Sequence, residues 1–249
     1  MIKKNYFSII IPVFNGQDFI KECIESVLLQ TYKKYEILIV NDCSTDSTLE
    51  LLKEYKKNKK IKIICNKKNL GISKSRNIGL KQASGNFISF IDADDVWEKD
   101  MLFEHFKCYE KGMDLVYTSY KRFGENKKEF IVISPKRLTL NMMMYSNFIP
   151  NSSASYNRKT LGLHFHTDLV RVCEDYIYWI EIFKKKPKNI GIQKILLRYR
   201  VHSNSMSSNK INTMKAVWKI HNEYLHQNFF LTSFYMFFWV FFAFKKRLF

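Results

Sequence analysis

The stretch Phe87-Ile88-Ser89-Phe90-Ile91-Asp92-Ala93-Asp94-Asp95 joins an apolar run to three carboxylates within four residues. An apolar run of this length is typical of a strand that is buried on both faces of a parallel sheet. Carboxylates this close repel one another, and a cation or several hydrogen-bond donors must neutralise them if they are to stay ionised. The stretch therefore predicts a site for a hard divalent cation at the carboxyl end of a strand. An acidic turn that caps a following helix is the alternative.

Strands and helices alternate on both sides of this stretch. Apolar runs predict four strands, and apolar residues at helical spacing predict a helix after each of the first three. The strands are Phe7–Val13, Tyr35–Val40, Ile61–Ile64 and Phe87–Ile91, and the helices begin near Ile20, Ser47 and Ser73. This alternation predicts right-handed crossovers and an α/β fold with a mostly parallel central sheet flanked by helices.

Polar side chains follow three of the four predicted strands. Asn15 follows the first strand, Asn41 and Asp42 follow the second, and the three carboxylates follow the fourth. Because ligands of such sheets bind beyond the carboxyl ends of the strands, we expect these side chains to share one site.

Composition narrows the class of protein. The 249 residues are 46% hydrophobic and 16% aromatic, which predicts a folded chain with an ample core. The net charge of +18 predicts a polyanionic partner, which is nucleic acid, an anionic membrane face or a phosphorylated ligand. Five scattered cysteines without a CxxC pair fit a reducing compartment.

Two common ways of holding a nucleotide are disfavoured. No GxGxxG follows the first strand and no P-loop ends in Gly-Lys-Ser/Thr, so a metal and basic side chains would have to hold any phosphates. Asp42 is a candidate to accept a hydrogen bond from a base edge, and Arg76 is a candidate contact for phosphate or ribose. A helix N-cap for Asp42 and an exposed helix position for Arg76 are the structural alternatives.

Four motifs, in order and spacing, resemble the nucleotide-sugar-binding half of family 2 glycosyltransferases with the GT-A fold. They are Ser8–Gly16 (SIIIPVFNG), Val40–Ser47 (VNDCSTDS), Asn69–Gly79 (NLGISKSRNIG) and Phe90–Trp97 (FIDADDVW). The resemblance implies a Rossmann-like nucleotide half over residues 1–120, an acceptor-binding and catalytic-base half over 121–210, and a helical, membrane-associating tail over 211–249. Cys43 departs from the pattern, because the family usually has glycine there.

The same resemblance implies a donor site. We expect Asp94 to hold Mn²⁺ or Mg²⁺, Asp92 to lie near the ribose, and Asp95 to support the metal loop or the acceptor. Asp42 is expected at the uracil ring. The remaining donor contacts are expected from Pro12, Asn15, Arg76 and Ala93.

Two later segments resemble further family features. Cys173–Ile180 carries an acidic pair before an aromatic helix, in which Asp175 matches the catalytic base and Glu174 supports it; an acidic pair favoured by the helix dipole is the alternative. Leu197–Ser207 resembles a YRxHxxSxS segment, which implies that His202 approaches the metal or diphosphate and that Arg200 supplies charge. A solvated histidine is the alternative there.

Two segments in the second half give weaker signals. Residues 141–150 are not assigned to an element, and Asn151–Ser155 is predicted as a polar loop that either contacts the acceptor or is an exposed linker.

The C-terminal run Phe229–Phe244 is followed by Lys245-Lys246-Arg247. Sixteen helical residues at about 1.5 Å each extend roughly 24 Å, short of the ~30 Å hydrocarbon core of a membrane. We expect an interfacial helix whose basic end meets anionic headgroups, with a core helix or a dimer contact as alternatives.

The resemblance, taken with these features, implies a metal-dependent, inverting hexosyltransferase. It would move glucose or galactose from a UDP-sugar to an undecaprenyl-diphosphate-linked or surface-glycan acceptor in O-antigen or capsule biosynthesis. We expect a cytoplasmic protein at the inner face of the membrane, without a nucleic-acid partner. A nucleotidyltransferase, which would need a glycine-rich phosphate loop, is one alternative. A basic nucleic-acid-binding protein, which would not need carboxylates at strand ends, is the other.

Overall fold

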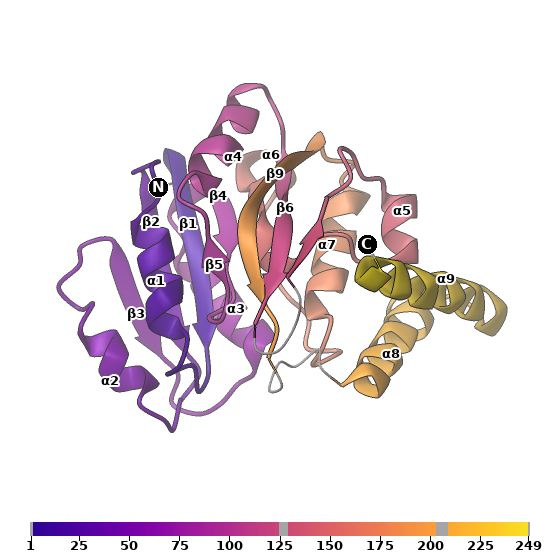
Figure 1. The fold of residues 1–249 in the computed structure, drawn as a ribbon, viewed down its shortest axis with the longest axis horizontal. Coiled ribbons are helices and arrows are strands. Elements are labelled where there is room, and N and C mark those ends of the chain that lie inside the picture. The colour runs from indigo at the N-terminus through magenta and orange to yellow at the C-terminus, as the bar shows by residue number, and fades with distance from the viewer. Residues whose placement is uncertain (1, 125–128, 203–208, 249) are drawn as a thin grey trace.

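A computed structural model describes residues 2–124, 129–202 and 209–248 of the chain (Figure 1). The strands are β1 Lys3–Val13, β2 Tyr35–Asn41, β3 Ile61–Cys65, β4 Gly85–Phe90, β5 Val96–Trp97, β6 Leu115–Phe123, β7 Phe130–Val132, β8 Ala154–Asn157 and β9 Asn189–Arg200. The α-helices are α1 Ile20–Leu28, α2 Thr48–Lys53, α3 Ile72–Gln82, α4 Met101–Glu110, α5 Leu140–Tyr145, α6 Arg158–Leu161, α7 Glu174–Lys184, α8 Lys210–Lys219 and α9 Phe229–Leu248. Two short elements complete the chain, the 3-10 helix η1 Asn151–Ser153 and the π-helical turn η3 Ile220–Tyr224.

The first half of the chain forms the parallel part of the sheet. In order across the sheet, β3, β2, β1 and β4 pair side by side in parallel. Residues 7–13 of β1 are all buried, as expected for a β-branched run with helices on both faces. The four predicted strands and the three predicted helices between them are confirmed, and with them the α/β fold class.

The second half of the chain extends the same sheet. β8 pairs antiparallel with both β4 and β6, β9 lies parallel to β6, and β5 pairs antiparallel with β9. Segments far apart in the sequence, such as β4 and β8, therefore lie side by side within the sheet (Figure 1). β6 runs across residue 120, the predicted boundary between the first two parts of the chain. The division of the chain into three parts stays a prediction.

The exposed-linker alternative for residues 151–155 is wrong. η1 and the start of β8 occupy this segment, and Asn151, Ser152 and Ser153 are at most 4% exposed. The reason is that β8 fills the space between β4 and β6, so its backbone groups complete hydrogen bonds in the middle of the sheet.

Apolar side chains cover both faces of the sheet. Alternate residues of β1 point to opposite faces, so that Ile9 belongs to one buried cluster, with α1 and α4, and Ile10 to the other, with α7. Trp179 of α7, which is fully buried, is the largest side chain of the second cluster.

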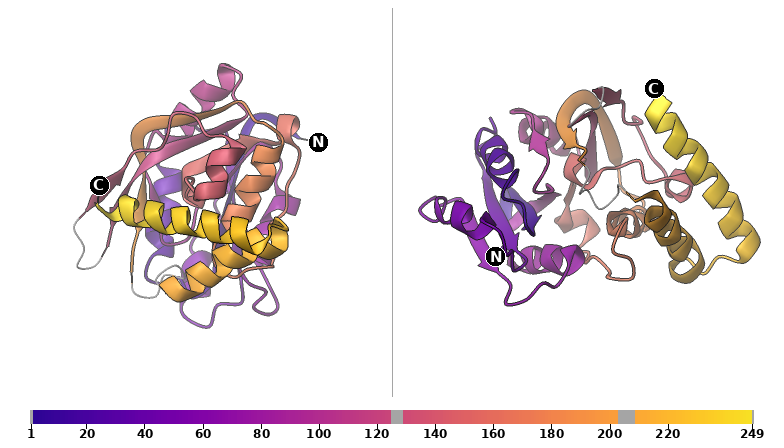
Figure 2. Two further views of the ribbon diagram at one scale, coloured as in Figure 1. Left: turned by 90° about the vertical axis from the view of Figure 1, so that its right-hand side faces the viewer. Right: turned by 60° about the horizontal axis from the view of Figure 1, so that its bottom comes forward.

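Residues after 210 form a helical unit at the side of the molecule (Figure 2). α9 packs against α5, where the ring of Tyr145 lies 5.2 Å from that of Tyr235 and 5.3 Å from that of Phe238. α5 occupies the start of the segment that the sequence left unassigned. Among the described residues, no helix combines the length and the apolar character that a membrane crossing requires.

Candidate active site

Asp42 organises the first wall of the site. It follows β2 directly and is 4% exposed. Its Oδ1 accepts hydrogen bonds from the backbone N of Leu70 at 2.9 Å and Nδ2 of Asn66 at 2.7 Å, and its Oδ2 accepts one from the N of Gly71 at 2.8 Å. Gly71 has φ +88°, a conformation that side chains disfavour. Ser47, not Asp42, is the N-cap of α2, so the capping alternative is wrong. The contact between Asp42 and a uracil edge stays a prediction.

Two left-handed residues shape the turns beside Asp42. Asn15 has φ +50°, and its Oδ1 accepts a hydrogen bond from the N of Thr45 at 2.8 Å, which joins the turn after β1 to the turn after β2. Cys43 has φ +62°. The turn that the resembling family makes with glycine therefore also forms with cysteine here, at a conformational cost of about 1–2 kcal/mol.

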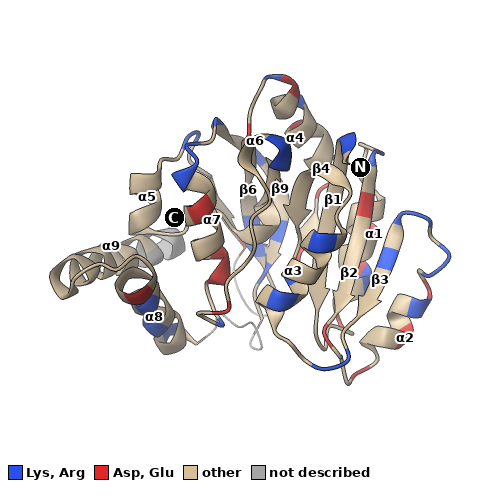
Figure 3. Ribbon diagram, turned by 180° about the vertical axis from the view of Figure 1, so that it is seen from behind, with Lys and Arg blue, Asp and Glu red and all other residues tan. Residues whose placement is uncertain are grey.

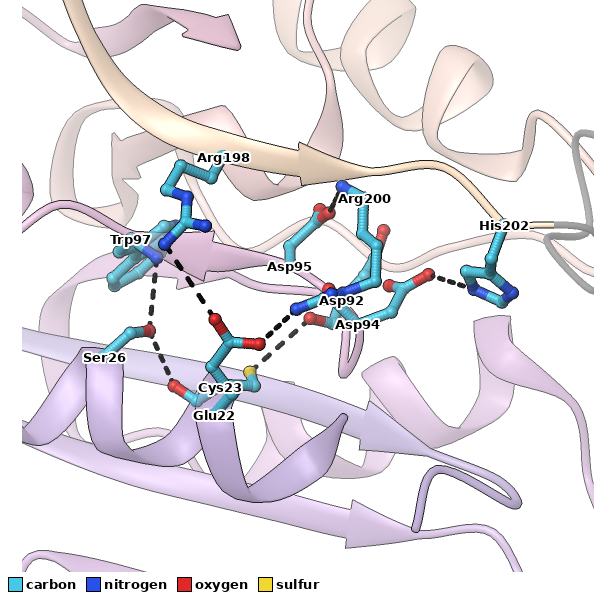
Figure 4. A network of polar contacts seen from close by, with 10 residues as sticks. All are labelled: Glu22, Cys23, Ser26, Asp92, Asp94, Asp95, Trp97, Arg198, Arg200 and His202. Carbon is cyan, nitrogen blue, oxygen red and sulfur yellow. Dashed lines mark hydrogen bonds and ion pairs between the residues drawn. The ribbon is translucent and has the colours of Figure 1, made fainter. Parts of the chain in front are cut away.

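The carboxylate loop after β4 is tied to the end of β9 (Figure 4). The backbone N of Arg200 donates to Oδ1 of Asp95 at 2.9 Å, and Nε of Arg200 donates to the backbone O of Asp94 at 2.8 Å. Nη2 of Arg200 also pairs with Oε2 of Glu22 on α1. Next along the chain, Nε2 of His202 lies 3.0 Å from Oδ2 of Asp94. The rest of the predicted segment, residues 203–207, lies outside the described residues.

The carboxylates of this loop oppose one another's ionisation. Burial, followed by the charge of Asp92, raises the pKa of Asp94, although His202 opposes the shift. Burial and the charges of Asp94 and Asp92 raise the pKa of Asp95 well above its usual range. A bound cation would relieve this repulsion.

The residues present fit a divalent ion whose remaining ligand atoms come from the substrate. Oδ2 of Asp94 and Nε2 of His202 lie 3.0 Å apart, in hydrogen-bond contact, and a carboxylate oxygen and an imidazole nitrogen are both atoms that a divalent cation accepts as ligands. Among the described residues, no set of three His, Cys, Asp or Glu side chains gathers into a metal site. An ion held by Asp94 and His202 would therefore need oxygens from a phosphorylated ligand, which is how Mg²⁺ is commonly bound.

Asp175 lies in the first turn of α7 and is partly buried. Its Oδ2 accepts a hydrogen bond from Nδ2 of Asn147 at 2.9 Å. Burial and then the charge of Glu174 raise the pKa of Asp175 to about 7, while Arg76 opposes the shift. A carboxylate that titrates near neutral pH is suited to accept a proton.

The exposed position considered for Arg76 is wrong, because this side chain is 1% exposed. Its Nη2 lies 2.5 Å from Oδ1 of Asp92, and its Nη1 pairs with Oε1 of Glu174. The two carboxylates raise the pKa of Arg76, although burial alone would lower it. The predicted contact between Arg76 and the donor stays a prediction.

A cleft of about 1590 Å³ brings these groups together at the carboxyl ends of the strands. Every predicted site residue except Asp95, which is buried beneath it, lines the cleft. These residues are Pro12, Asn15, Asp42, Arg76, Asp92, Ala93, Asp94, Glu174, Asp175, Arg200 and His202.

The sequence analysis missed three polar partners of these residues. Asn147 contacts Asp175, Glu22 pairs with Arg200, and the amide oxygen of Asn151, when turned toward Arg76, accepts hydrogen bonds of 3.1 Å from its Nε and Nη2. None of the three stands in a recognisable motif. Only the three-dimensional arrangement reveals them.

The fold and the cleft at its strand ends are those of a glycosyltransferase of the GT-A type, and comparison with known proteins agrees. Residues 8–172 match glycosyl transferase family 2, so the chain belongs to this family and is a glycosyltransferase. TuaG of Bacillus subtilis, a putative teichuronic acid biosynthesis glycosyltransferase, is 30% identical over 224 residues, which are 88% of each chain. WfgD of Escherichia coli, a UDP-Glc:α-D-GlcNAc-diphosphoundecaprenol β-1,3-glucosyltransferase, is 31% identical over 220 residues, 88% of this chain and 86% of WfgD.

Solved structures confirm the predicted GT-A fold. Residues 1–349 of S. aureus TarS in complex with UDP-GlcNAc superpose with a TM-score of 0.72 at 22% identity, over 86% of this chain and 65% of TarS 1–349. The mannosyltransferase PcManGT of Pyrobaculum calidifontis, in complex with GDP-Man and Mn²⁺, gives a TM-score of 0.68 at 16% identity, over 89% of this chain and 64% of PcManGT. The chain thus spans about two thirds of the length of these solved proteins.

Proposed function

We propose that the chain transfers a hexose, glucose or galactose, from a UDP-sugar to a lipid-linked or surface-glycan sugar, with inversion at the anomeric carbon. The observation that carries this proposal is Asp175, whose pKa of about 7 suits a general base, on the wall of the same cleft as Asp42 and Asp94. The name of WfgD, which specifies UDP-glucose and a diphosphoundecaprenol acceptor, supports glucose and a lipid-linked acceptor. We place this transfer in O-antigen or capsule biosynthesis.

Asp175 takes the proton in this reaction. As the acceptor oxygen bonds to the anomeric carbon, its hydrogen moves to the Asp175 carboxylate. At the same time the bond between the anomeric carbon and the diphosphate oxygen breaks, and UDP leaves with the electron pair. Asn147 holds the carboxylate through Oδ2. General-base catalysis of this kind contributes about 10²- to 10⁴-fold to the rate.

The wall of the cleft opposite Asp175 would hold the donor. Asp94 and His202 would hold Mn²⁺ or Mg²⁺, which supplies positive charge that stabilises the departing diphosphate when it is bound. Asp42 is assigned to the uracil edge and Asp92 to the ribose. Arg200, which is bound to the loop of Asp94, keeps this loop at the end of β9.

A donor screen tests the proposal. Purified protein with Mn²⁺ is mixed with each UDP-sugar in turn, and UDP release is measured with and without a lipid-diphosphate-sugar acceptor. We expect release with UDP-glucose or UDP-galactose that depends on the acceptor. Absence of acceptor-dependent release with every UDP-sugar would refute the donor class.

We further propose that α9 attaches the enzyme to an anionic membrane face. Phe230, Phe234, Phe237 and Phe241 recur four, three and four residues apart and lie on one side of the helix, where they are 82%, 47%, 68% and 54% exposed. We call these four residues the phenylalanine stripe. Apolar stripes of this size are uncommon on monomers and mark contact surfaces.

Charge favours a membrane over a second copy of the chain as the partner of the phenylalanine stripe. Residues 229–244 carry no charge, and Lys245-Lys246-Arg247 follow directly. Figure 3 shows basic positions on other helices such as α3 and α8, whereas the coloured part of α9 carries no charged residue. With a net charge of +18, the molecule repels its own copies and is attracted to anionic lipids. These observations support a cytoplasmic enzyme bound peripherally at the inner leaflet, where lipid-linked acceptors lie.

A further inference from the structure

Arg76 lies at the junction of the donor and acceptor walls of the cleft. It comes from α3, on the nucleotide side, and is 1% exposed. Nη2 contacts Asp92 after β4, Nη1 contacts Glu174 at the start of α7, and Nε with Nη2 reaches the amide oxygen of Asn151 in η1. Each of the three guanidinium nitrogens therefore donates to a protein side chain. Arg76 thus connects its own helix α3 with the loop after β4, with α7 and with η1.

A buried guanidinium in this position needs its partners. Removing a charge from water is costly unless geometry and hydrogen bonds compensate for it. The planar fork of arginine suits two carboxylates and an amide at once, which the flexible ammonium of lysine does not. The arrangement therefore determines where Asp92 and Glu174 lie relative to each other.

We propose that Arg76 and Glu174 form a positioning pair, which holds the donor-side Asp92 and the proposed base Asp175 in register across the cleft. This inference rests on the proposed function, because it takes Asp175 to be the base. Neither Arg76 nor Glu174 exchanges a proton in the reaction. Arg76 acts on the acceptor wall through Glu174 and on the donor wall through Asp92.

The charged and polar groups that face Asp175 are identified by the structure. They include Glu174 on its own helix, Arg76 on α3, Asp92 after β4, the amide of Asn147, and the thiol of Cys173, whose pKa the charge of Asp175 raises. Glu174 and Asp92 raise the pKa of Asp175, whereas Arg76 and the Asn147 hydrogen bond lower it. Lys210, at the start of α8, acts on the neighbouring thiol of Cys173.

The positioning pair makes a prediction that simple structural support does not. Since the base must be ionised, activity rises as the pH passes through the pKa of Asp175. Loss of the negative charge in Glu174→Gln should move this acid limb of kcat/KM to lower pH by about one unit, and loss of the positive charge in Arg76→Gln should move it to higher pH by about one unit. The double variant should return it toward the wild-type position, since the two charges act in opposite directions.

The control is Lys81→Gln, which removes a positive charge from an exposed position of the same helix. Its acid limb should not move. Circular dichroism checks that each variant is folded. Arg76→Gln leaves the carboxylates of Asp92 and Glu174 without their cation, which can unfold the protein. The double variant also lacks the Glu174 carboxylate, so its acid limb is measured if the single variant does not fold.

A direct titration separates this inference from the proposed function. Carboxyl-¹³C aspartate is incorporated, and NMR spectra of the Mg²⁺ form are recorded against pH, with Asp175→Asn identifying the signal. Opposite displacements of the Asp175 titration in Glu174→Gln and Arg76→Gln support the positioning pair even if no UDP-sugar is turned over. An Asp175 titration that is unmoved in every folded variant, the double variant included, overturns it, whether or not the enzyme transfers sugar.

Discussion

Asp175 should make the transfer reaction strongly dependent on pH near neutrality. With a pKa of about 7, its carboxylate is about one tenth ionised at pH 6 and about nine tenths ionised at pH 8. If Asp175 is the base, kcat/KM should therefore rise about tenfold between these two values. An aspartate at its usual pKa of 3.8 would be fully ionised throughout and would give a flat profile.

The same burial should destabilise the fold at high pH. The folded pKa of Asp175 lies about three pH units above its usual value, and each unit corresponds to about 1.4 kcal/mol. Because the folded state holds the proton more tightly than the unfolded state, stability should fall as the pH rises from about 4 to about 7. The upper limit of this loss is about 4 kcal/mol, and partial exposure of the side chain reduces it.

Asp175→Asn combines both effects in one assay series. UDP release should fall about 10²- to 10⁴-fold at pH 8, while the affinity for UDP measured by calorimetry stays unchanged. The melting temperature of the variant should exceed that of the wild type at pH 8, and the difference should shrink as the pH falls toward 4. Undiminished transfer by Asp175→Asn, or a wild-type rate that is flat from pH 6 to pH 8, would refute the assignment.

Three further predictions concern the metal, the C-terminal helix and the turn after β2. Asp94→Ala should abolish Mn²⁺-dependent UDP release and also the rise in melting temperature produced by Mn²⁺ with UDP; an unchanged rise would remove Asp94 from the metal. Phe237→Glu should reduce co-sedimentation with anionic vesicles several-fold, whereas Leu29→Glu, at the equally exposed apolar residue that follows α1, should not; a concentration-dependent dimer disrupted by Phe237→Glu would instead identify a second copy as the partner. Cys43→Gly should raise the free energy of unfolding in urea by about 1 kcal/mol because φ is +62°, whereas Cys65→Gly, in the strand β3, should lower it.

The sequence predicted the parts of the fold that depend on local pattern. Each strand of the parallel half contains an apolar run, and two carboxylates that line the cleft, Asp42 and Asp92, come just after such runs in β2 and β4. In these places burial follows from the apolar pattern, and a parallel sheet brings strand ends to one edge.

Local pattern failed where distant partners decide the structure. Asn151–Ser153 are polar and suggest a loop, yet they are buried because β8 inserts between β4 and β6. Arg76 has the appearance of a surface helix residue, because its partner Glu174 lies 98 positions further along the chain. The apolar C-terminal run predicted the helix α9 correctly but not its contacts. Tyr145, whose ring packs against α9, belongs to a segment without a clear pattern.

The contacts between the end of β9 and the carboxylate loop after β4 have a consequence for the synthesis of the protein. Arg200 lies 105 positions after Asp95, and His202 lies 108 positions after Asp94, so a nascent chain can pair β1 to β4 long before these contacts exist. Contacts between such distant positions form late, because closing a long loop is entropically unfavourable. A ribosome-bound fragment that ends before Arg200 therefore lacks the contacts that hold the carboxylate loop, and this loop is completed only after β9 has been synthesised.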